Sequence, residues 1–275
     1  MKLSLISLAL LAAVGTATAQ PAPAPARKAG PRKAAAATQV TWLGHAAFRI
    51  VTPSGKTLLV DPWLSNPSNP TGKDEAKSTK ADLILITHAH FDHVGDATDI
   101  AKRTKAKLVA TFDLGNAIVG SGFPKDQFGM DTGGNFGGTL SLLDGEVNVT
   151  FVPAIHSSVT GDGKAAGNPG GFVIAVTGGP TIYHTGDTDV FGDMAQIGRF
   201  KKIDLMLACI GGHFTMDPRR AAEAAKLVRP KQIAPMHYGT FPVLKGTPAE
   251  LGTALKKSAP GVKLVTLEVG KPITL

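Results

Sequence analysis

The chain contains 275 residues, of which 43% are hydrophobic, and its 29 basic and 21 acidic residues give a formal net charge of +8. Five of the basic residues lie within the first 38 positions, which contain no acidic residue, so the remainder carries a net charge of only +3. The basic balance is therefore no argument for a nucleic-acid partner, and we expect none. The single cysteine, Cys209, excludes an intramolecular disulfide framework.

Residues 1–19 have the pattern of a secretory signal peptide. Lys2 provides the positive charge, residues 3–14 form a short apolar segment, and "ATA" at 17–19 matches a small-residue cleavage site. The apolar segment is shorter than the roughly 20 residues that a membrane-spanning helix needs. We therefore expect an exported protein, periplasmic or secreted, without a stable membrane span.

Residues 20–38 are rich in proline and alanine and carry four basic residues. A segment of this composition cannot bury a core, so we expect an extended tether. Residues 39–275 then have the size of one large domain.

From residue 39 onward, short apolar runs recur between glycine, proline, asparagine and aspartate residues, as strands do. The expected strands lie within 39–43, 47–51, 57–60, 82–86, 107–110, 147–152, 171–176, 181–185, 203–209, 232–236 and 262–269. Helical patterns occur at 95–106, 217–230 and 247–260, and in the last two Asp217 and Thr247 stand at the N-cap before a proline. This mixture predicts a layered α/β domain.

The segment "ITHAHFDHVGD" at 86–96 contains three of the eight histidines and follows a predicted strand. Alternate side chains of an extended chain point to the same side, so His88 and His90 can contact one metal ion. Asp92 and His93, beyond the turn, can then face a second ion. The segment therefore predicts one half of a two-metal site.

Three residues distant in the sequence are candidates for the other half. His156, Asp187 and His237 each follow a predicted strand and precede a loop. Strand ends that converge on one edge are the usual place for a site in an α/β domain. We therefore expect these three side chains to complete the metal ligands.

These motifs together resemble the metallo-β-lactamase superfamily. The resemblance rests on "THAHFDHVGD", the distant His156, "HTGDTD" and "PMHYGTFP", with further matches in "WLGHAAFRI" and "LLVDPWLSNP". Within the superfamily, the chain most resembles metal-dependent hydrolases related to ascorbate-phosphate lactonases. The match covers most of residues 40–245 in the right order, and it implies a four-layer αββα sandwich.

The resemblance also implies two divalent metal ions, with zinc favoured and manganese, iron or nickel compatible with nitrogen and oxygen ligands. It assigns the first ion to His88, His90 and His156, the second to Asp92, His93 and His237, and a bridging position to Asp187. A hydroxide between the ions would be the nucleophile. Asp92 and Asp187 are thus the candidate catalytic residues, and Asp92 would also give a proton to the leaving group.

Seven further residues are candidates for support or substrate contact. The resemblance places Asp61 beneath the site, where it would hold a ligand by a hydrogen bond. His45 would line the pocket mouth or serve as a structural hydrogen-bonding residue, and His213 would line the pocket. Tyr238, with Trp63, Phe214 and Phe241, would form an apolar pocket wall or pack in the core.

The sequence therefore predicts an exported, dinuclear metal-dependent hydrolase that acts on a small molecule, with a lactone or other ester favoured. Phosphodiesterase or nuclease activity and β-lactamase-type hydrolysis are the enzymatic alternatives. The β-lactam-hydrolysing branch has a cysteine where this chain has Asp187, which disfavours that activity. A non-catalytic metal-binding protein is the alternative from a different class, and the complete set of ligand residues argues against it.

Overall fold

The computed structural model describes residues 37–275. The predicted signal peptide (1–19) and most of the predicted tether (20–38) lie outside the described residues. Thr38, which the sequence assigns to the tether, is buried, and its backbone carbonyl accepts a hydrogen bond from Leu275 N–H at 3.0 Å. The folded part therefore includes Thr38.

The first sheet has seven strands and is antiparallel on one side and parallel on the other. Its order is β14 (Pro272–Thr274), β1 (Gln39–Trp42), β2 (Phe48–Val51), β3 (Thr57–Val60), β4 (Leu83–Leu85), β5 (Lys107–Thr111) and β6 (Gly133–Gly134). Pairing is antiparallel from β14 to β3 and parallel from β3 to β6.

The second sheet also has seven strands. Its order is β13 (Lys263–Leu264), β12 (Gln232–Met236), β11 (Leu205–Cys209), β10 (Thr181–His184), β9 (Gly170–Val176), β8 (Val147–Pro153) and β7 (Thr139–Leu142). Pairing is antiparallel from β7 to β10 and parallel from β10 to β13.

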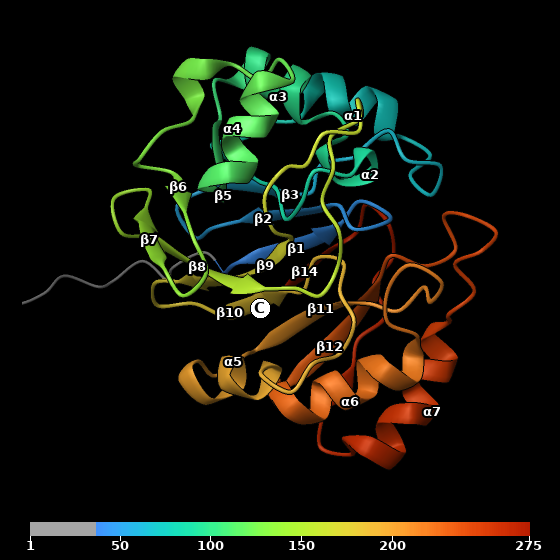
Figure 1. The fold of residues 1–275 in the computed structure, drawn as a ribbon. Helices are drawn as coiled ribbons and strands as arrows, with labels where there is room; N and C mark the ends of the chain where they lie inside the picture. Colours follow the sequence, from blue (N-terminus) through green and yellow to red (C-terminus); the bar gives the residue numbers. More distant parts are fainter. Residues whose placement is uncertain (1–36) are drawn as a thin grey trace, which may run out of the picture. The chain divides into compact units, whose positions relative to one another are not determined.

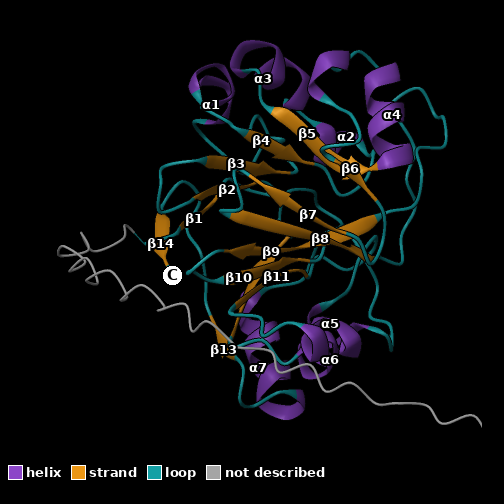
Figure 2. Cartoon of the chain, turned by 90° about the vertical axis from the view of Figure 1, so that its left-hand side faces the viewer, coloured by secondary structure: helices purple, strands orange, loops and turns teal. Residues whose placement is uncertain are grey.

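Helices cover the outer face of each sheet (Figures 1 and 2). The helices beside the first sheet are α1 (Gly72–Ser78), α2 (Phe91–Val94), α3 (Ala97–Thr104) and α4 (Phe112–Gly120), followed by a short 3-10 turn at Lys125–Gln127. Those beside the second sheet are α5 (Met194–Phe200), α6 (Pro218–Val228) and α7 (Pro248–Ser258). The predicted αββα sandwich is confirmed. Within residues 37–275, no helix has both the length and the apolar character that crossing a membrane requires.

The apolar runs of the first sheet are continuous because its inner strands are buried on both faces. In β3, Leu58 and Val60 join the core between the sheets, whereas Leu59 joins a smaller core beneath the helices. The same alternation separates Leu85 from Ile84 in β4. Because successive side chains of a strand point to opposite faces of the sheet, each of these strands contributes to both cores.

The two capped helices form as the sequence predicts. Asp217 accepts a hydrogen bond from Arg220 N–H at the start of α6, and Thr247 forms a capping box with Glu250 at the start of α7.

The strand predicted at 262–269 is wrong beyond its first residues, because only Lys263–Leu264 form β13. Val265 N–H still reaches Ile233 of the second sheet, but Gly270 N–H donates to Trp42 of the first. The chain crosses between the sheets over this stretch, so it cannot continue as one strand. Its apolar residues are nevertheless used, since Leu267 is buried in the core between the sheets.

Two contacts in the second half fix neighbouring elements. The Asp204 carboxylate accepts from Thr181 N–H at 2.8 Å and lies 2.6 Å from Lys231 Nζ, which ties together the starts of β10, β11 and β12. Partial burial would raise the pKa of Asp204, but these two partners outweigh it and hold that pKa below its ordinary value.

In α5, a Cβ at Gly198 would lie 1.8 Å from the Val228 carbonyl oxygen, so α5 and the end of α6 can meet only at a glycine.

Candidate metal centre

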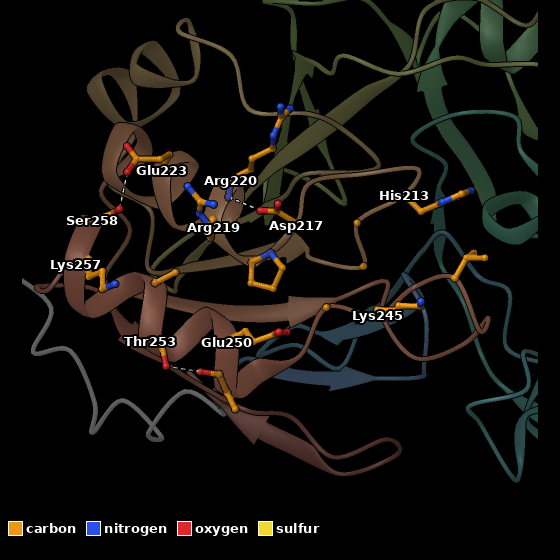
Figure 3. A pocket seen from close by; sticks show the side chains of 17 residues that line it. His213, Asp217, Arg219, Arg220, Glu223, Lys245, Glu250, Thr253, Lys257 and Ser258 are labelled. Carbon is orange, nitrogen blue, oxygen red and sulfur yellow. Dashed lines mark hydrogen bonds between the residues drawn. The ribbon is translucent and has the colours of Figure 1, made fainter.

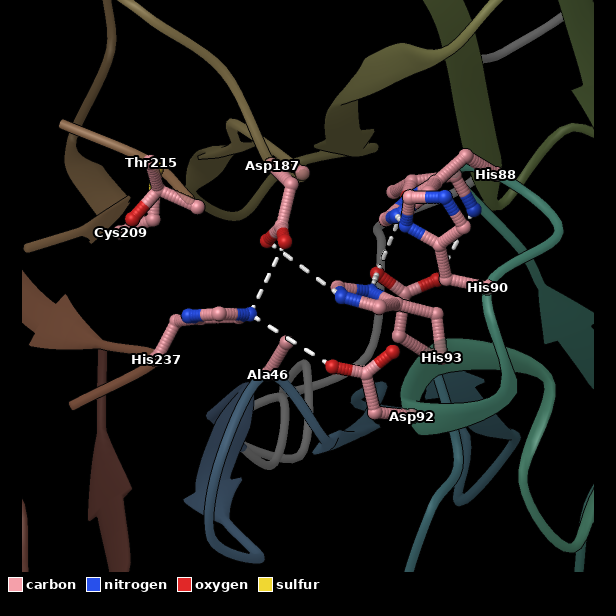
Figure 4. Close-up of polar contacts among 12 residues, drawn as sticks. Ala46, His88, His90, Asp92, His93, Asp187, Cys209, Thr215 and His237 are labelled. Atoms are coloured by element: carbon pink, nitrogen blue, oxygen red, sulfur yellow. Dashed lines mark hydrogen bonds and ion pairs between the residues drawn. The ribbon is translucent and has the colours of Figure 1, made fainter. Parts of the chain in front are cut away.

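All seven predicted metal ligands lie after strands, and the two sheets both contribute. His88 and His90 follow β4 of the first sheet, and Asp92 and His93 lie in α2 directly beyond. From the second sheet, the remaining ligands follow β8, β10 and β12, and they are His156, Asp187 and His237. Figure 4 shows side chains from both sheets pointing toward one another. The structure therefore brings together residues up to 149 positions apart, from His88 to His237.

His88, His90 and His156 form a group of imidazoles. One ring nitrogen of each lies within 4.8 Å of the others, and His88 Nε2 is 3.0 Å from His90 Nδ1. His88 is fully buried, whereas His90 and His156 are partly exposed. Burial, reinforced by the neighbouring imidazoles, lowers the pKa of all three rings and keeps them neutral. A neutral imidazole has the free lone pair that a metal ion requires.

Asp187 lies between this group and a second group, which consists of Asp92, His93 and His237. Its Oδ2 is 2.9 Å from His237 Nε2 and 3.7 Å from His156 Nε2, and its Oδ1 is 3.4 Å from His93 Nε2. Asp92 Oδ2 lies 3.8 Å from His237 Nε2. Asp187 thus faces histidines of both groups.

Several atoms here are buried without a hydrogen-bond partner among the described residues. They are His93 Nε2, Asp187 Oδ1 and both ring nitrogens of His237, although His93 Nε2 and His237 Nε2 do face the Asp187 carboxylate in the ion pairs given above. Buried polar atoms without partners are costly in a protein interior, and they are explained when an ion binds them. Imidazole nitrogens and carboxylate oxygens are the donors that divalent transition metals bind, so these residues fit such ions.

The pKa shifts of this second group follow from its two carboxylates. Burial would lower the pKa of His237, but Asp187 outweighs it and raises that pKa to about 9. Burial would also lower the pKa of His93, but Asp187 and Asp61 outweigh it and raise that pKa well above its ordinary value. Conversely, the imidazoles hold the pKa values of Asp187 and Asp92 below the ordinary range although burial would raise them. The carboxylates therefore concentrate negative charge that attracts cations.

Asp61 lies beneath the second group and fixes the His93 ring. It follows β3 with a left-handed backbone (φ +45°) and is fully buried. His93 Nδ1–H donates to Asp61 Oδ2 at 2.7 Å, and Thr87 donates to the same carboxylate from its backbone N–H (2.8 Å) and its hydroxyl (2.7 Å). Since Asp61 holds the proton on Nδ1, Nε2 is the nitrogen directed at Asp187 and the one that would bind a metal ion after losing its own proton.

Thr87 is a contributor that the sequence reasoning missed. Besides its two bonds to Asp61, its Oγ1 lies 3.0 Å from His88 Nδ1. Since the hydroxyl hydrogen goes to Asp61, Thr87 Oγ1 accepts from His88 and leaves His88 Nε2 bare. The only sequence signal is the position of Thr87 directly before the histidine cluster.

His184 shapes the turn that presents Asp187. It is fully buried, its Nε2 bonds to the Ala46 carbonyl at 3.0 Å, and its Nδ1 accepts from Gly186 N–H at 3.1 Å. Gly186 has φ +61°, and a Cβ there would lie 2.4 Å from the Gly170 carbonyl oxygen. Glycine is therefore required for the approach of this turn to β9.

His45 is fully buried. It lies in the loop between β1 and β2 with φ +51°, and its Nε2 is 3.0 Å from Asp92 Oδ2. These contacts are those of a hydrogen-bonded histidine, one of the two roles that the sequence leaves open, and the substrate contact stays a prediction. No sequence feature revealed the partner, which lies 47 residues away.

The structure brings together two of the four aromatic residues that the sequence assigns to an apolar pocket wall. Trp63 and Phe241 stack with ring centroids 5.9 Å apart, and Phe91, which the sequence reasoning did not include, packs on Trp63 at 5.7 Å. Phe91 stands between His90 and Asp92 and is 64% exposed. Tyr238 instead stacks on Trp42 at 5.4 Å and packs against the core between the sheets.

His213 lies outside both ligand groups. It is exposed, has φ +59° and contacts the Phe214 ring. It lines a hollow of about 370 Å³ that reaches Ile155, next to His156. It also borders a larger groove of about 1440 Å³ along α6 and α7 (Figure 3), which contains none of the predicted ligands.

Comparison with known proteins agrees with this geometry. Residues 39–237 match the family model described as "Beta-lactamase superfamily domain". The chain is 56% identical over 250 residues to a UPF0173 metal-dependent hydrolase of Anaeromyxobacter sp. (strain K), a match that covers 89% of each chain. It is 52% identical over 247 residues to one from Thermodesulfovibrio yellowstonii, covering 87% of this chain and 92% of the relative.

Among solved structures, the fold is similar to that of Igni18, described as a novel metallo hydrolase from the hyperthermophilic archaeon Ignicoccus hospitalis. The TM-score is 0.76 at 37% sequence identity, and the match covers 86% of this chain and 98% of Igni18.

Proposed function

This chain belongs to the metallo-β-lactamase superfamily and is a metal-dependent hydrolase, and from that premise we propose that it is an exported enzyme that uses two divalent metal ions to hydrolyse a lactone or other ester. The observation that carries the two-metal proposal is the position of Asp187. Its carboxylate faces His156 of one ligand group and His93 and His237 of the other, as a bridging ligand would.

The proposed ligands divide between the ions as the groups do. His88, His90 and His156 would hold one ion, and Asp92, His93 and His237 the other, with Asp187 shared. With Asp187 shared, each ion would have nitrogen and oxygen donors and no sulfur, which suits zinc and also manganese, iron or nickel.

When bound, the two ions would activate water as the nucleophile and polarise the carbonyl of the ester. Asp187 and the histidines fix where that chemistry occurs, since Thr87 and Asp61 set the ring orientations of His88 and His93. Asp92 is the most exposed carboxylate of the cluster, with 13% of its side chain accessible. It can therefore orient the nucleophile and pass a proton to the leaving group.

The aromatic residues beside Asp92 support an uncharged substrate. Trp63, Phe91 and Phe241 contact one another next to His45 and Asp92, with His45 and Trp63 ring centroids 5.3 Å apart. Apolar surface at this place suits the acyl part of an ester or lactone better than a polyanionic nucleic acid. We therefore rank a phosphodiester below an ester, and a β-lactam below both because Asp187 replaces cysteine.

The proposal is tested by metal analysis of purified protein, followed by activity on lactones, aryl esters, phosphodiesters and β-lactams before and after chelation. We expect close to two ions per chain and ester hydrolysis that is lost on chelation and restored by zinc. Asp187→Asn should lose both metal and activity, whereas Asp189→Asn, which alters a half-exposed carboxylate paired with Arg220, should retain both. Full ester hydrolysis by metal-free protein would refute the mechanism.

Export rests on the sequence of residues 1–19 alone. Expression of the full chain with cell fractionation tests it directly. We expect a periplasmic or secreted product that begins at Gln20, and a cytoplasmic product when residues 2–19 are deleted. A full-length product retained in the cytoplasm would contradict the proposal.

A further inference from the structure

His45 lies inside the second ligand group, but its role there differs from that of its neighbours. One side-chain atom from each of His45, Asp92, His93 and His237 lies within 4.8 Å of the other three. His45 could therefore bind a metal ion through a bare Nε2. Alternatively, Nε2 carries a proton and donates to Asp92 Oδ2, 3.0 Å away.

The other hydrogen bonds of the ring distinguish these two cases. The Ser68 hydroxyl donates to Thr240 Oγ1 at 3.2 Å, and Thr240 Oγ1 lies 3.0 Å from His45 Nδ1. Because Thr240 accepts from Ser68, its own hydrogen is available for Nδ1. A neutral imidazole has one N–H and one bare nitrogen, so an accepting Nδ1 places the proton on Nε2. The chain of bonds thus runs in one direction, from Ser68 to Asp92.

This arrangement is the reverse of that at His93. The Nδ1–H of His93 donates to Asp61, so Nε2, which faces the cluster, is the nitrogen that a metal ion would take. In His45 the nitrogen that faces the cluster is the one with the proton, and the bare nitrogen faces Thr240. A protonated nitrogen has no lone pair for a metal ion, so His45 Nε2 can only donate.

The backbone of His45 holds a second predicted ligand. Its carbonyl oxygen accepts from His237 N–H at 2.9 Å and from Trp42 Nε1–H at 2.9 Å, and the His45 and His237 rings are 3.9 Å apart. The preceding Gly44 permits this loop, since a Cβ there would lie 2.5 Å from Asn66 Oδ1. One residue therefore fixes Asp92 through its side chain and His237 through its backbone.

We propose that His45 is a positioning residue that donates its Nε2–H to Asp92 and anchors His237, and that it is not a metal ligand. The expected effect of His45 on metal binding rests on the proposed metal centre, whereas the Nε2–H tautomer of His45 is a property of the chain without metal. The two can therefore fail separately.

The direct test is nuclear magnetic resonance of protein with ¹⁵N-labelled histidine, in which long-range ¹H–¹⁵N correlations identify the protonated ring nitrogen. His45 signals are assigned by their loss in His45→Gln. We expect Nε2–H in metal-free protein and again after loading with ¹¹³Cd²⁺, without coupling between ¹¹³Cd and His45. In Thr240→Val, which removes the partner of Nδ1, we expect Nε2–H to persist, because the Asp92 carboxylate that faces Nε2 can only accept. A bare Nε2 in metal-free protein, or coupling of ¹¹³Cd to His45, would overturn the proposal.

A pair of variants separates donation from ligation by metal affinity. Glutamine can donate an N–H to Asp92 but leucine cannot, and both variants bear the same left-handed backbone at position 45. We expect His45→Gln to bind Zn²⁺ within about threefold of the wild type, and His45→Leu to bind it about 10- to 100-fold more weakly, the usual loss when a supporting hydrogen bond is removed. Equal losses in the two variants would contradict a role as hydrogen-bond donor.

Discussion

Asp61→Asn tests the hydrogen-bonded support of the metal centre. The change preserves side-chain size, and asparagine tolerates the left-handed backbone of this position (φ +45°). The amide oxygen can still accept from Thr87 N–H. The amide nitrogen, however, cannot accept from the Thr87 hydroxyl or from His93 Nδ1–H, as Asp61 Oδ2 does now.

The size of the effect follows from these lost bonds. Asp61 is fully buried, so both donors lose a charged acceptor that water does not replace. A hydrogen bond to a charged group contributes about 1.5 to 3 kcal/mol, so two give a loss of about 3 to 6 kcal/mol in the free energy of unfolding. His93 would also lose its fixed orientation, which we expect to weaken Zn²⁺ binding about 10- to 100-fold.

Urea unfolding of chelated protein measures the first quantity, and Zn²⁺ titration against a competing chelator measures the second. Asp82→Asn is a matched control, because Asp82 accepts from Thr57 N–H at 2.8 Å at the opposite end of the β3–β4 pair. It should cost about 1 kcal/mol and leave Zn²⁺ affinity unchanged. Wild-type Zn²⁺ affinity in Asp61→Asn, or an equal loss in the control, would refute the reasoning.

Three further changes probe other parts of the molecule. Asp204 has a folded pKa below its unfolded value of about 3.9, so its ionised form adds stability above that pH, and this stability is lost as the pH falls through the folded pKa. The deficit of Asp204→Asn in urea unfolding should therefore be about 1 kcal/mol at pH 7 and shrink as the pH falls through the folded pKa. A deficit independent of pH would exclude this origin. Gly198→Ala should lower the free energy of unfolding by at least about 2 kcal/mol, since its Cβ would overlap the Val228 carbonyl; unchanged thermal stability would count against the close approach of α5 and α6. Phe91→Ala should reduce kcat/KM about tenfold for esters with long acyl chains but not for acetate esters, because burial of an exposed phenyl ring contributes about 1.5 kcal/mol. Phe200→Ala is the control, since Phe200 on α5 is also largely exposed, and a similar drop for both chain lengths would argue against apolar recognition.

The sequence was sufficient for most strands, and the seven residues that it proposes as ligands lie together in the structure. Strand ends can be recognised locally, because an apolar run stops at a polar residue that a loop follows. The helices at 217–230 and 247–260 were also predictable, since Asp217 and Thr247 are local N-cap signals that need no tertiary contact.

The contacts that the sequence did not reveal depend on residues far apart in the chain. His45 meets Thr240, 195 positions away, only because the loop after β12 returns to the loop after β1. Strand β14 exists because the chain crosses from the second sheet to pair with β1, and a short run such as Pro272–Thr274 carries no signal of that. Phe91 stood within the histidine cluster, but its contact with Trp63 required the β3–α1 loop to be placed.

The division of the ligands between the two sheets has a consequence for how activity depends on assembly. Neither half of the sandwich holds a complete set, since His88 and His90 come with the first sheet and Asp187 and His237 with the second. Bound ions would therefore cross-link the halves, and metal affinity would report how well they are docked. A substitution in the shared core, such as at Phe151, could weaken metal binding without touching a ligand. Hydrolysis would then be restricted to the completed fold, and a half-formed chain would be inert.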